Sequence, residues 1–204
     1  MVKRNIGVVL FDQFELLDVF GPLEMFGVLP KSFEIHLLAE QPGTVASTQG
    51  PRSVVDRTFA DAGSLDMLLI PGGRGARNEV GNEFLLDWLR QRAEDAEVVA
   101  SVCTGSAVLA AAGLLNGRRA TSNKRSFEWV MTQGPEVLWV PEARWVVDGK
   151  FHTSGGVAAG IDMALEIISD LEGEEVAVKV AEGTEYDWHR DASWDPFAKL
   201  AGLV

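Results

Sequence analysis

The chain has 204 residues, a hydrophobic content of 47% and a formal net charge of −12. This length suits one domain, because single cores keep growing to roughly 250 residues before chains divide. The acidic balance argues against nucleic acid and against an anionic membrane surface, since both require a basic face. No apolar run reaches the roughly 18–20 residues that a membrane span needs. The single cysteine excludes an internal disulfide and fits a reducing cytoplasm.

Short apolar runs alternate with amphipathic stretches along the chain. Strands are expected at Ile6–Phe11, Phe33–Leu38, Met67–Ile70 and Val98–Val102, with hairpins pairing 45–47 with 53–55 and 144–147 with 150–153. Helices are expected over 17–29, 84–93, 106–112, from Ser154-Gly155-Gly156 through Ile168, and over 174–181. Pro22 fits only the first turn of its helix.

This alternation predicts an α/β fold, a single-domain three-layer α/β/α sandwich with a mostly parallel sheet over residues 1–204. Sites in such folds lie beyond the carboxyl ends of the strands. Small residues break the chain at three such ends, Pro71–Gly73, Cys103–Gly105 and Ser154–Gly156. They leave backbone amides free and let a ligand approach closely.

Cys103 directly follows an apolar strand and precedes a helix. One interpretation is a buried, inert small side chain. The other is a nucleophile on a strand-to-helix turn, where the helix amino terminus favours thiolate over thiol. The turn and the small residues around it favour the nucleophile.

Asp18 lies between Leu17 and Val19, an apolar context in which a carboxylate is out of place unless it is hydrogen-bonded. Burial would raise its pKa and make it a proton donor. The alternative is an N-cap for a helix that starts near Gly21-Pro22.

Four motifs in the same order resemble the ThiJ/PfpI superfamily, a branch of the class I glutamine-amidotransferase-like fold. They are Leu17–Pro22, Ile70–Gly73, the nucleophile segment Ala100–Ser106 with Ala111–Gly117, and Gly155–Asp162. The resemblance covers residues 6–185. Among the subgroups, it is strongest to isocyanide hydratases and to the sensor domains of AraC-type regulators.

The resemblance implies a role for each matching position. Cys103 is the nucleophile, Asp18 handles its proton, and Thr104 contacts the site. Gly73 matches an oxyanion donor, and the expected substrate- or oxyanion-binding positions are Gly72, Gly73, Gly155 and Gly156. A small-molecule substrate, no cofactor and a homodimer are expected.

Two departures from the family pattern bear on the chemistry. Thr104 stands where protease-like and amidotransferase-like relatives place a histidine, and residues 121–124 read Thr-Ser-Asn-Lys where hydratase-like relatives often have a Thr-His-Trp segment. The first departure weakens a peptidase or amidase interpretation. The second puts the substrate pocket in question.

The three histidines are weak site candidates. His36 lies in a strand and is expected to be structural, whereas His152 leads to the Gly155-Gly156 turn and is a possible site residue. The spacing around His189 does not define a ligand face, so no metal is expected. The Trp-rich tail, residues 186–204, is expected to pack on the body or on a dimer partner, with Phe20, Met25 and residues 188–197 as candidate dimer contacts.

Three functions are compatible with these residues. The first is a cofactor-free hydratase or lyase in which Cys103 attacks an electrophilic carbon such as that of an isocyanide. The second is a repair or glyoxalase-like enzyme acting on dicarbonyls, which would usually need a histidine near the thiol. The third is a small-molecule or redox sensor. The hydratase is favoured.

Overall fold

A computed structural model describes residues 3–204 of the chain. The strands are β1 (Arg4–Val9), β2 (Phe33–Ala39), β3 (Thr44–Ala46), β4 (Arg52–Val54), β5 (Arg57–Thr58), β6 (Met67–Ile70), β7 (Val98–Ser101), β8 (Arg119–Ala120), β9 (Leu138–Trp139), β10 (Trp145–Asp148) and β11 (Phe151–Ser154). The helices are α1 (Leu16–Gly27), α2 (Ala76–Glu79), α3 (Glu83–Asp95), α4 (Gly105–Ala111), α5 (Phe127–Gln133), α6 (Ala159–Glu172), α7 (Glu174–Gly183) and α8 (Pro196–Leu200), with a short 3₁₀ helix η1 (Lys124–Ser126) before α5.

The main sheet has seven strands in the order β10-β11-β7-β6-β1-β2-β5. Every neighbouring pair is parallel except β10 with β11, which form the predicted hairpin. β6 and β7 are buried at every position, as expected of strands covered on both faces. The predicted single-domain α/β fold with a mostly parallel sheet is therefore confirmed.

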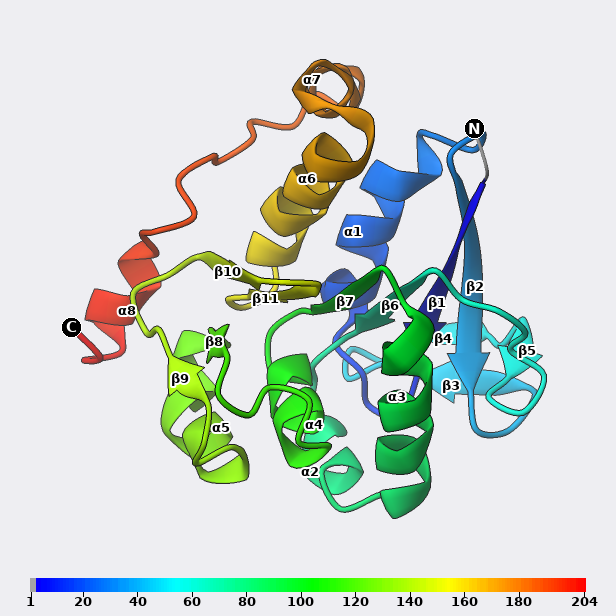
Figure 1. Cartoon of the computed structure of the whole chain (residues 1–204), viewed down its shortest axis with the longest axis horizontal. Helices are drawn as coiled ribbons and strands as arrows, with labels where there is room; N and C mark the ends of the chain where they lie inside the picture. Colours follow the sequence, from blue (N-terminus) through cyan, green and yellow to red (C-terminus); the bar gives the residue numbers. More distant parts are fainter. Residues whose placement is uncertain (1–2) are drawn as a thin grey trace.

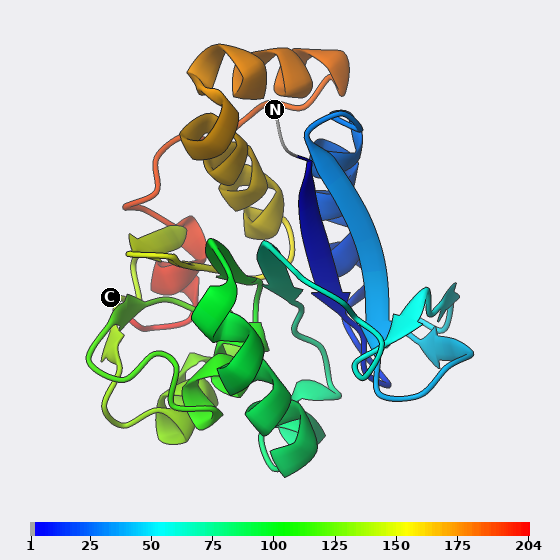
Figure 2. The same ribbon diagram turned by 45° about the vertical axis from the view of Figure 1, so that its right-hand side comes forward.

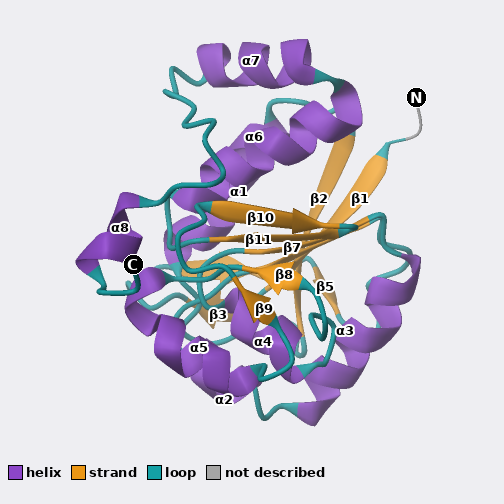
Figure 3. Cartoon of the chain, turned by 60° about the vertical axis from the view of Figure 1, so that its left-hand side comes forward, coloured by secondary structure: helices purple, strands orange, loops and turns teal. Residues whose placement is uncertain are grey.

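Helices cover both faces of this sheet (Figures 1 and 3). α1 and α6 pack together on one face, with α7 beyond them, and α3, α4 and α5 lie on the other. Gly21 lets α1 approach α6 closely, because a Cβ there would lie 2.8 Å from Cγ1 of Ile161. Within residues 3–204, no helix is both long and apolar enough to cross a bilayer.

Two details of α1 differ from the sequence prediction. The helix begins at Leu16, so Pro22 lies inside it and not in its first turn. Because proline has no N–H, the backbone carbonyl of Asp18 loses its helical partner. Met25 was expected at a dimer contact, but it is buried inside the chain, and the hydroxyl of Thr184 approaches its sulfur at 3.9 Å.

The C-terminal segment after α7 runs along the side of the domain to α8 (Figure 2). Asp162 of α6, which is fully buried, holds it in place. Its carboxylate accepts hydrogen bonds from the Tyr186 hydroxyl at 3.1 Å, from the His189 backbone N–H at 2.9 Å and from Arg144 Nε at 2.8 Å. Arg144 also donates its backbone N–H to the carbonyl of Ala192 at 2.8 Å. The segment is thus anchored to both α6 and β10.

Candidate active site

Cys103 lies in a tight turn between β7 and α4. Its φ angle is +57°, in the left-handed region that residues other than glycine rarely adopt. Its backbone N–H donates to the carbonyl of Gly155 at 3.1 Å, and its carbonyl accepts the hydroxyls of Ser122 and Ser106 at 2.9 and 3.2 Å. These three bonds hold the unfavourable backbone conformation in place. The side chain projects from the end of the strand, and the residue is 7% exposed.

Asp18 faces this turn from the first turns of α1. It is fully buried, and its Oδ2 accepts the backbone N–H of Gly72 at 2.9 Å. Within residues 3–204, Oδ1 has no further hydrogen bond of good geometry. The N-cap residue of α1 is Glu15, so the interpretation of Asp18 as a helix cap is wrong.

Burial sets the protonation of both groups. It raises the pKa of Asp18 to about 7, although the Gly72 N–H, the Cys103 thiol and the Val157 N–H oppose the rise. Burial also raises the pKa of the Cys103 thiol well above its ordinary value, and the charge of Asp18 raises it further. The backbone N–H groups of Thr104 and Val157 act in the other direction on the sulfur.

This electrostatic balance corrects one expectation from the sequence. The amino terminus of α4 was expected to leave Cys103 as a thiolate. α4 has only seven residues, and burial beside Asp18 outweighs its dipole. The resting form is therefore a thiol next to a carboxyl group that is about half protonated at neutral pH.

The Gly72-Gly73 segment connects these groups. The N–H of Gly73 donates to Oγ1 of Thr104 at 3.1 Å, just as that of Gly72 donates to Asp18. A Cβ on Gly72 would lie 2.5 Å from the Thr104 nitrogen, so only glycine fits there. Both amides thus already donate to protein side chains. Their role as oxyanion donors stays a prediction, because each N–H would first have to leave its side-chain acceptor and donate to the substrate.

The third predicted break, Ser154–Gly156, leads into a loop that ends at Val157. Val157 has a φ of +48°, a genuine outlier for a β-branched residue. The Val157 N–H acts on both the thiol and the carboxyl group and lowers the pKa of each. Sequence reasoning missed Val157, because a backbone donor has no side-chain signature. Only the neighbouring pair Gly155-Gly156 indicated that the backbone of this loop lies close to the site.

The sequence from residue 4 to residue 170 matches the DJ-1/PfpI family. The chain belongs to the DJ-1/PfpI family. It is 39% identical to the isonitrile hydratase of Pseudomonas putida over 182 residues, which is 89% of this chain and 78% of that protein. It is 32% identical to a deglycase of Thermococcus kodakarensis over 145 residues, 70% of this chain and 84% of the relative.

Solved structures of this family have the same fold. A ThiJ/PfpI family protein from Pseudomonas syringae superposes with a TM-score of 0.85 at 31% identity, covering 92% of this chain and 76% of the other. The resemblance expected from the four motifs is therefore confirmed, including the similarity to an isonitrile hydratase.

His152 does not reach the site of this DJ-1/PfpI chain. Neighbouring Thr153 accepts the Thr121 N–H at 2.9 Å on the α4 side of the sheet, so His152 faces α6. Its Nε2 lies 3.8 Å from Asp170, about three turns along α6 from the end nearest Cys103. His152, a possible site residue in the sequence analysis, therefore lies away from Cys103. In the described part of the chain, both of its ring nitrogens lack a hydrogen bond.

The buried His152 predicts a pH dependence of stability. Burial lowers its pKa to about 4, whereas a histidine in the unfolded chain has its ordinary pKa of 6.5. Between these values the unfolded state binds the extra proton, so the free energy of unfolding falls as the pH drops, by about 3 kcal/mol at most. His152→Phe should flatten this slope in urea titrations from pH 7 to pH 4. Exposed His189→Gln is the control, and an unchanged slope in His152→Phe would contradict the assignment.

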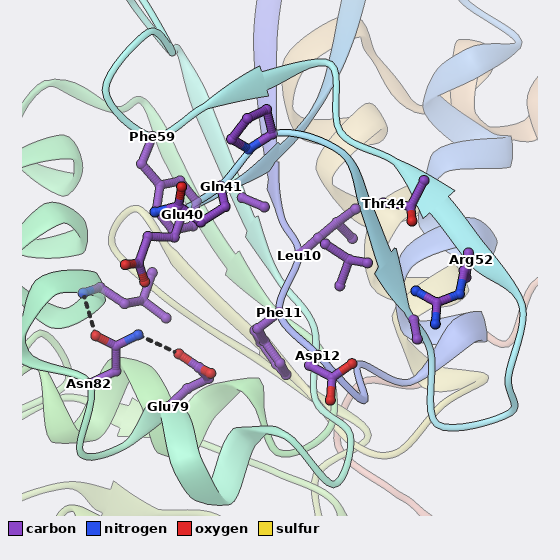
Figure 4. Close-up of a pocket in the computed structure, with 15 residues that line it drawn as sticks. Leu10, Phe11, Asp12, Glu40, Gln41, Thr44, Arg52, Phe59, Glu79 and Asn82 are labelled. Carbon is purple, nitrogen blue, oxygen red and sulfur yellow. Dashed lines mark hydrogen bonds between the residues drawn. The ribbon is translucent and has the colours of Figure 1, made fainter.

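A well-formed pocket of about 310 Å³ lies away from Cys103, at the carboxyl ends of β1 and β2 (Figure 4). Leu10, Phe59 and Leu85 contribute apolar walls, while Glu79 accepts the side-chain amide of Asn82 at 2.8 Å. Its lining contains no cysteine and none of the predicted site residues. No group of three or more potential metal ligands occurs among residues 3–204.

Proposed function

We propose that this DJ-1/PfpI protein is a cofactor-free hydratase that converts isocyanides into N-substituted formamides. The observation that carries the proposal is the buried pair of Cys103 and Asp18, in which the Asp18 carboxyl group has a pKa raised to about 7 and its charge acts on the thiol. Such a carboxyl group both donates and accepts protons at neutral pH. The similarity to an isonitrile hydratase supports the same conclusion.

In the first step, the sulfur of Cys103 bonds to the terminal carbon of R–N≡C. The carboxylate of Asp18 accepts the thiol proton and delivers it to that carbon, which gives the thioimidate Cys–S–CH=N–R. The N–H groups of Thr104 and Val157 stabilise the negative sulfur while the proton is in transit.

In the second step, water adds to the thioimidate carbon. Asp18 takes one proton from the water and passes it to the nitrogen, which gives the tetrahedral intermediate Cys–S–CH(OH)–NH–R. The hydroxyl proton of this intermediate then goes to Asp18 as the carbon–sulfur bond breaks. The product R–NH–CHO leaves, and the proton held by Asp18 restores the thiol. The hydrogen bond from the Gly73 N–H to Oγ1 of Thr104 keeps the turn between β7 and α4 in place during both steps. Substrate binding at Gly155 and Gly156 stays a prediction, because a Cβ on either glycine would lie within 2.8 Å of Asp195 or Asn123.

A repair or glyoxalase-like activity on dicarbonyls is the second candidate, and the deglycase relative favours it. The placement of the histidines opposes it. His36 lies in β2, where its Nε2 is 3.4 Å from Oδ1 of Asn5. His152 faces α6, and His189 lies in the C-terminal segment. None of them is available to move protons at a dicarbonyl bound to Cys103.

The two candidates separate in one experiment. The purified protein is offered an aryl isocyanide and, in parallel, methylglyoxal, and the aryl formamide and lactate are quantified by chromatography. We expect formamide at a rate well above that of buffer. Formation of lactate without formamide would contradict the hydratase proposal and support the glyoxalase-like activity. If neither product forms, the result would contradict both activities and support the interpretation of the protein as a sensor.

We also propose that the protein is a homodimer that binds a small-molecule substrate. Four large apolar side chains remain 41–57% exposed at the helix that carries Asp18 and at the C-terminal segment: Leu17, Phe20, Trp194 and Phe197. A second copy would cover them. A solution mass of twice the 22.1 kDa of the chain is expected from light scattering, and a monomer mass at micromolar concentration would contradict the dimer.

A further inference from the structure

Two side chains from distant segments hold the glycine pair beside Cys103. A Cβ on Gly155 would lie 2.8 Å from Oδ2 of Asp195, in the C-terminal segment. A Cβ on Gly156 would collide with Nδ2 of Asn123, at the start of η1. The pair is therefore packed between Asp195 on one side and Asn123 on the other, and neither glycine can shift toward them.

Both flanking side chains are themselves fixed. Asp195 is 2% exposed, its backbone N–H donates to the Glu142 carbonyl at 2.7 Å, and its Oδ1 accepts the Phe197 N–H at 3.0 Å as the N-cap of α8. Asn123 is held in the same way, because its Oδ1 accepts the Ser126 N–H at 3.1 Å. In each case one oxygen caps a helix, and the other end of the side chain meets a glycine.

The glycine pair controls two contacts of the nucleophile. The carbonyl of Gly155 accepts the Cys103 N–H at 3.1 Å. The residue after Gly156 is Val157, whose N–H lowers the pKa of the Cys103 thiol. The strained backbone of Val157 has to be held from outside, since its φ of +48° is unfavourable. The residues before it are held by the Gly155 N–H, which donates to the Arg144 carbonyl at 2.7 Å, and by the contacts with Asp195 and Asn123.

We infer that Asp195 and Asn123 are positioning residues that hold the Gly155–Val157 loop so that the Val157 N–H stays aimed at Cys103. Lys124, which follows Asn123 in the chain, is buried near the two supports. Its ammonium group donates to Oγ1 of Thr121 at 2.8 Å and to the Ala143 carbonyl, and Asp195 is the carboxylate that acts on it most strongly. The inference rests on the proposed function only for its effect on turnover, because thiol reactivity is measured without substrate.

The test uses the rate of Cys103 alkylation by iodoacetamide as a function of pH. Because Cys103 is the single cysteine, intact mass reports this site alone. Asp195→Ser keeps an N-cap for α8 but withdraws the side chain from Gly155. Asp195→Asn keeps both the cap and the contact. Asn123→Ser applies the same logic to the other support and covers the case in which Asp195→Ser fails to fold.

We expect Asp195→Ser and Asn123→Ser to be alkylated roughly ten-fold or more slowly at pH 7, with a raised thiol pKa, because the thiolate loses a hydrogen bond to charge. Asp195→Asn should stay close to the unchanged protein, as should the control Glu142→Gln. Unchanged or faster alkylation in both serine variants would overturn the inference. If the alkylation rate falls equally in Asp195→Asn and Asp195→Ser, the effect is due to the charge of Asp195 and not to its contact with Gly155. That result would also overturn the inference.

Discussion

Replacing Cys103 by serine is expected to lower isocyanide turnover by roughly 10⁴-fold or more. A serine hydroxyl is a far weaker nucleophile than a thiol, and no histidine lies beside this position to activate it. Formamide production measured by chromatography gives the rate. Intact mass after a rapid quench detects the thioimidate adduct, which should be present in the unchanged protein and absent from the variant.

Ser101→Ala is the matched control for this replacement. Ser101 is buried in β7 two residues before Cys103, and its hydroxyl has no hydrogen bond within the described residues. Its loss should change turnover by no more than a few-fold. Persistent turnover in Cys103→Ser would show that another group attacks the substrate, and the proposed mechanism would be wrong.

Replacing Asp18 by asparagine is expected to lower turnover by around 10²–10⁴-fold. Asparagine keeps the shape of the side chain and can still accept the Gly72 N–H, but it carries no transferable proton. Glu15→Gln is the control, because this carboxylate acts on Asp18 only through its charge, from outside the site. If an established hydratase activity survives in Asp18→Asn, the proton-carrier role is wrong.

The pH profile gives this replacement a second signature. In the unchanged protein the first proton leaves the Asp18–Cys103 pair near pH 7, so kcat/KM should rise with pH through about 7. In Asp18→Asn only the thiol remains, and burial keeps its pKa above the ordinary value. The rise should therefore move to alkaline pH. A sensor would show a different pattern, with ligand binding or oxidation of Cys103 little changed and no substrate turned over.

The parts of this structure that could be predicted depend on local patterns. β6 and β7 are continuous apolar runs, and the turn at Cys103 follows from a small-residue break after such a run. The hairpin of β10 and β11 follows from Asp148-Gly149, where Gly149 adopts a φ of +60°. In each case, neighbours in sequence determine the conformation.

The parts that could not be predicted depend on contacts between distant segments. α5 and α8 are short and gain their stability from packing, so periodicity alone did not indicate them. The supports at Asn123 and Asp195 reach Gly155 and Gly156 from segments far away in sequence. His152 has the right place in the chain for a site residue but the wrong face of the sheet, and this face depends on the strand register.

The pairing of α1 with α6 has a consequence for how the protein is made. α1 ends at Gly27, whereas its partner α6 begins at Ala159, so the ribosome must synthesise most of the chain before the two can meet. Until then the apolar side of α1 remains open to solvent and to chaperones. The layer that carries Asp18 therefore completes its folding only late in translation, and stalled or truncated chains would present an aggregation-prone helix in place of a finished active site.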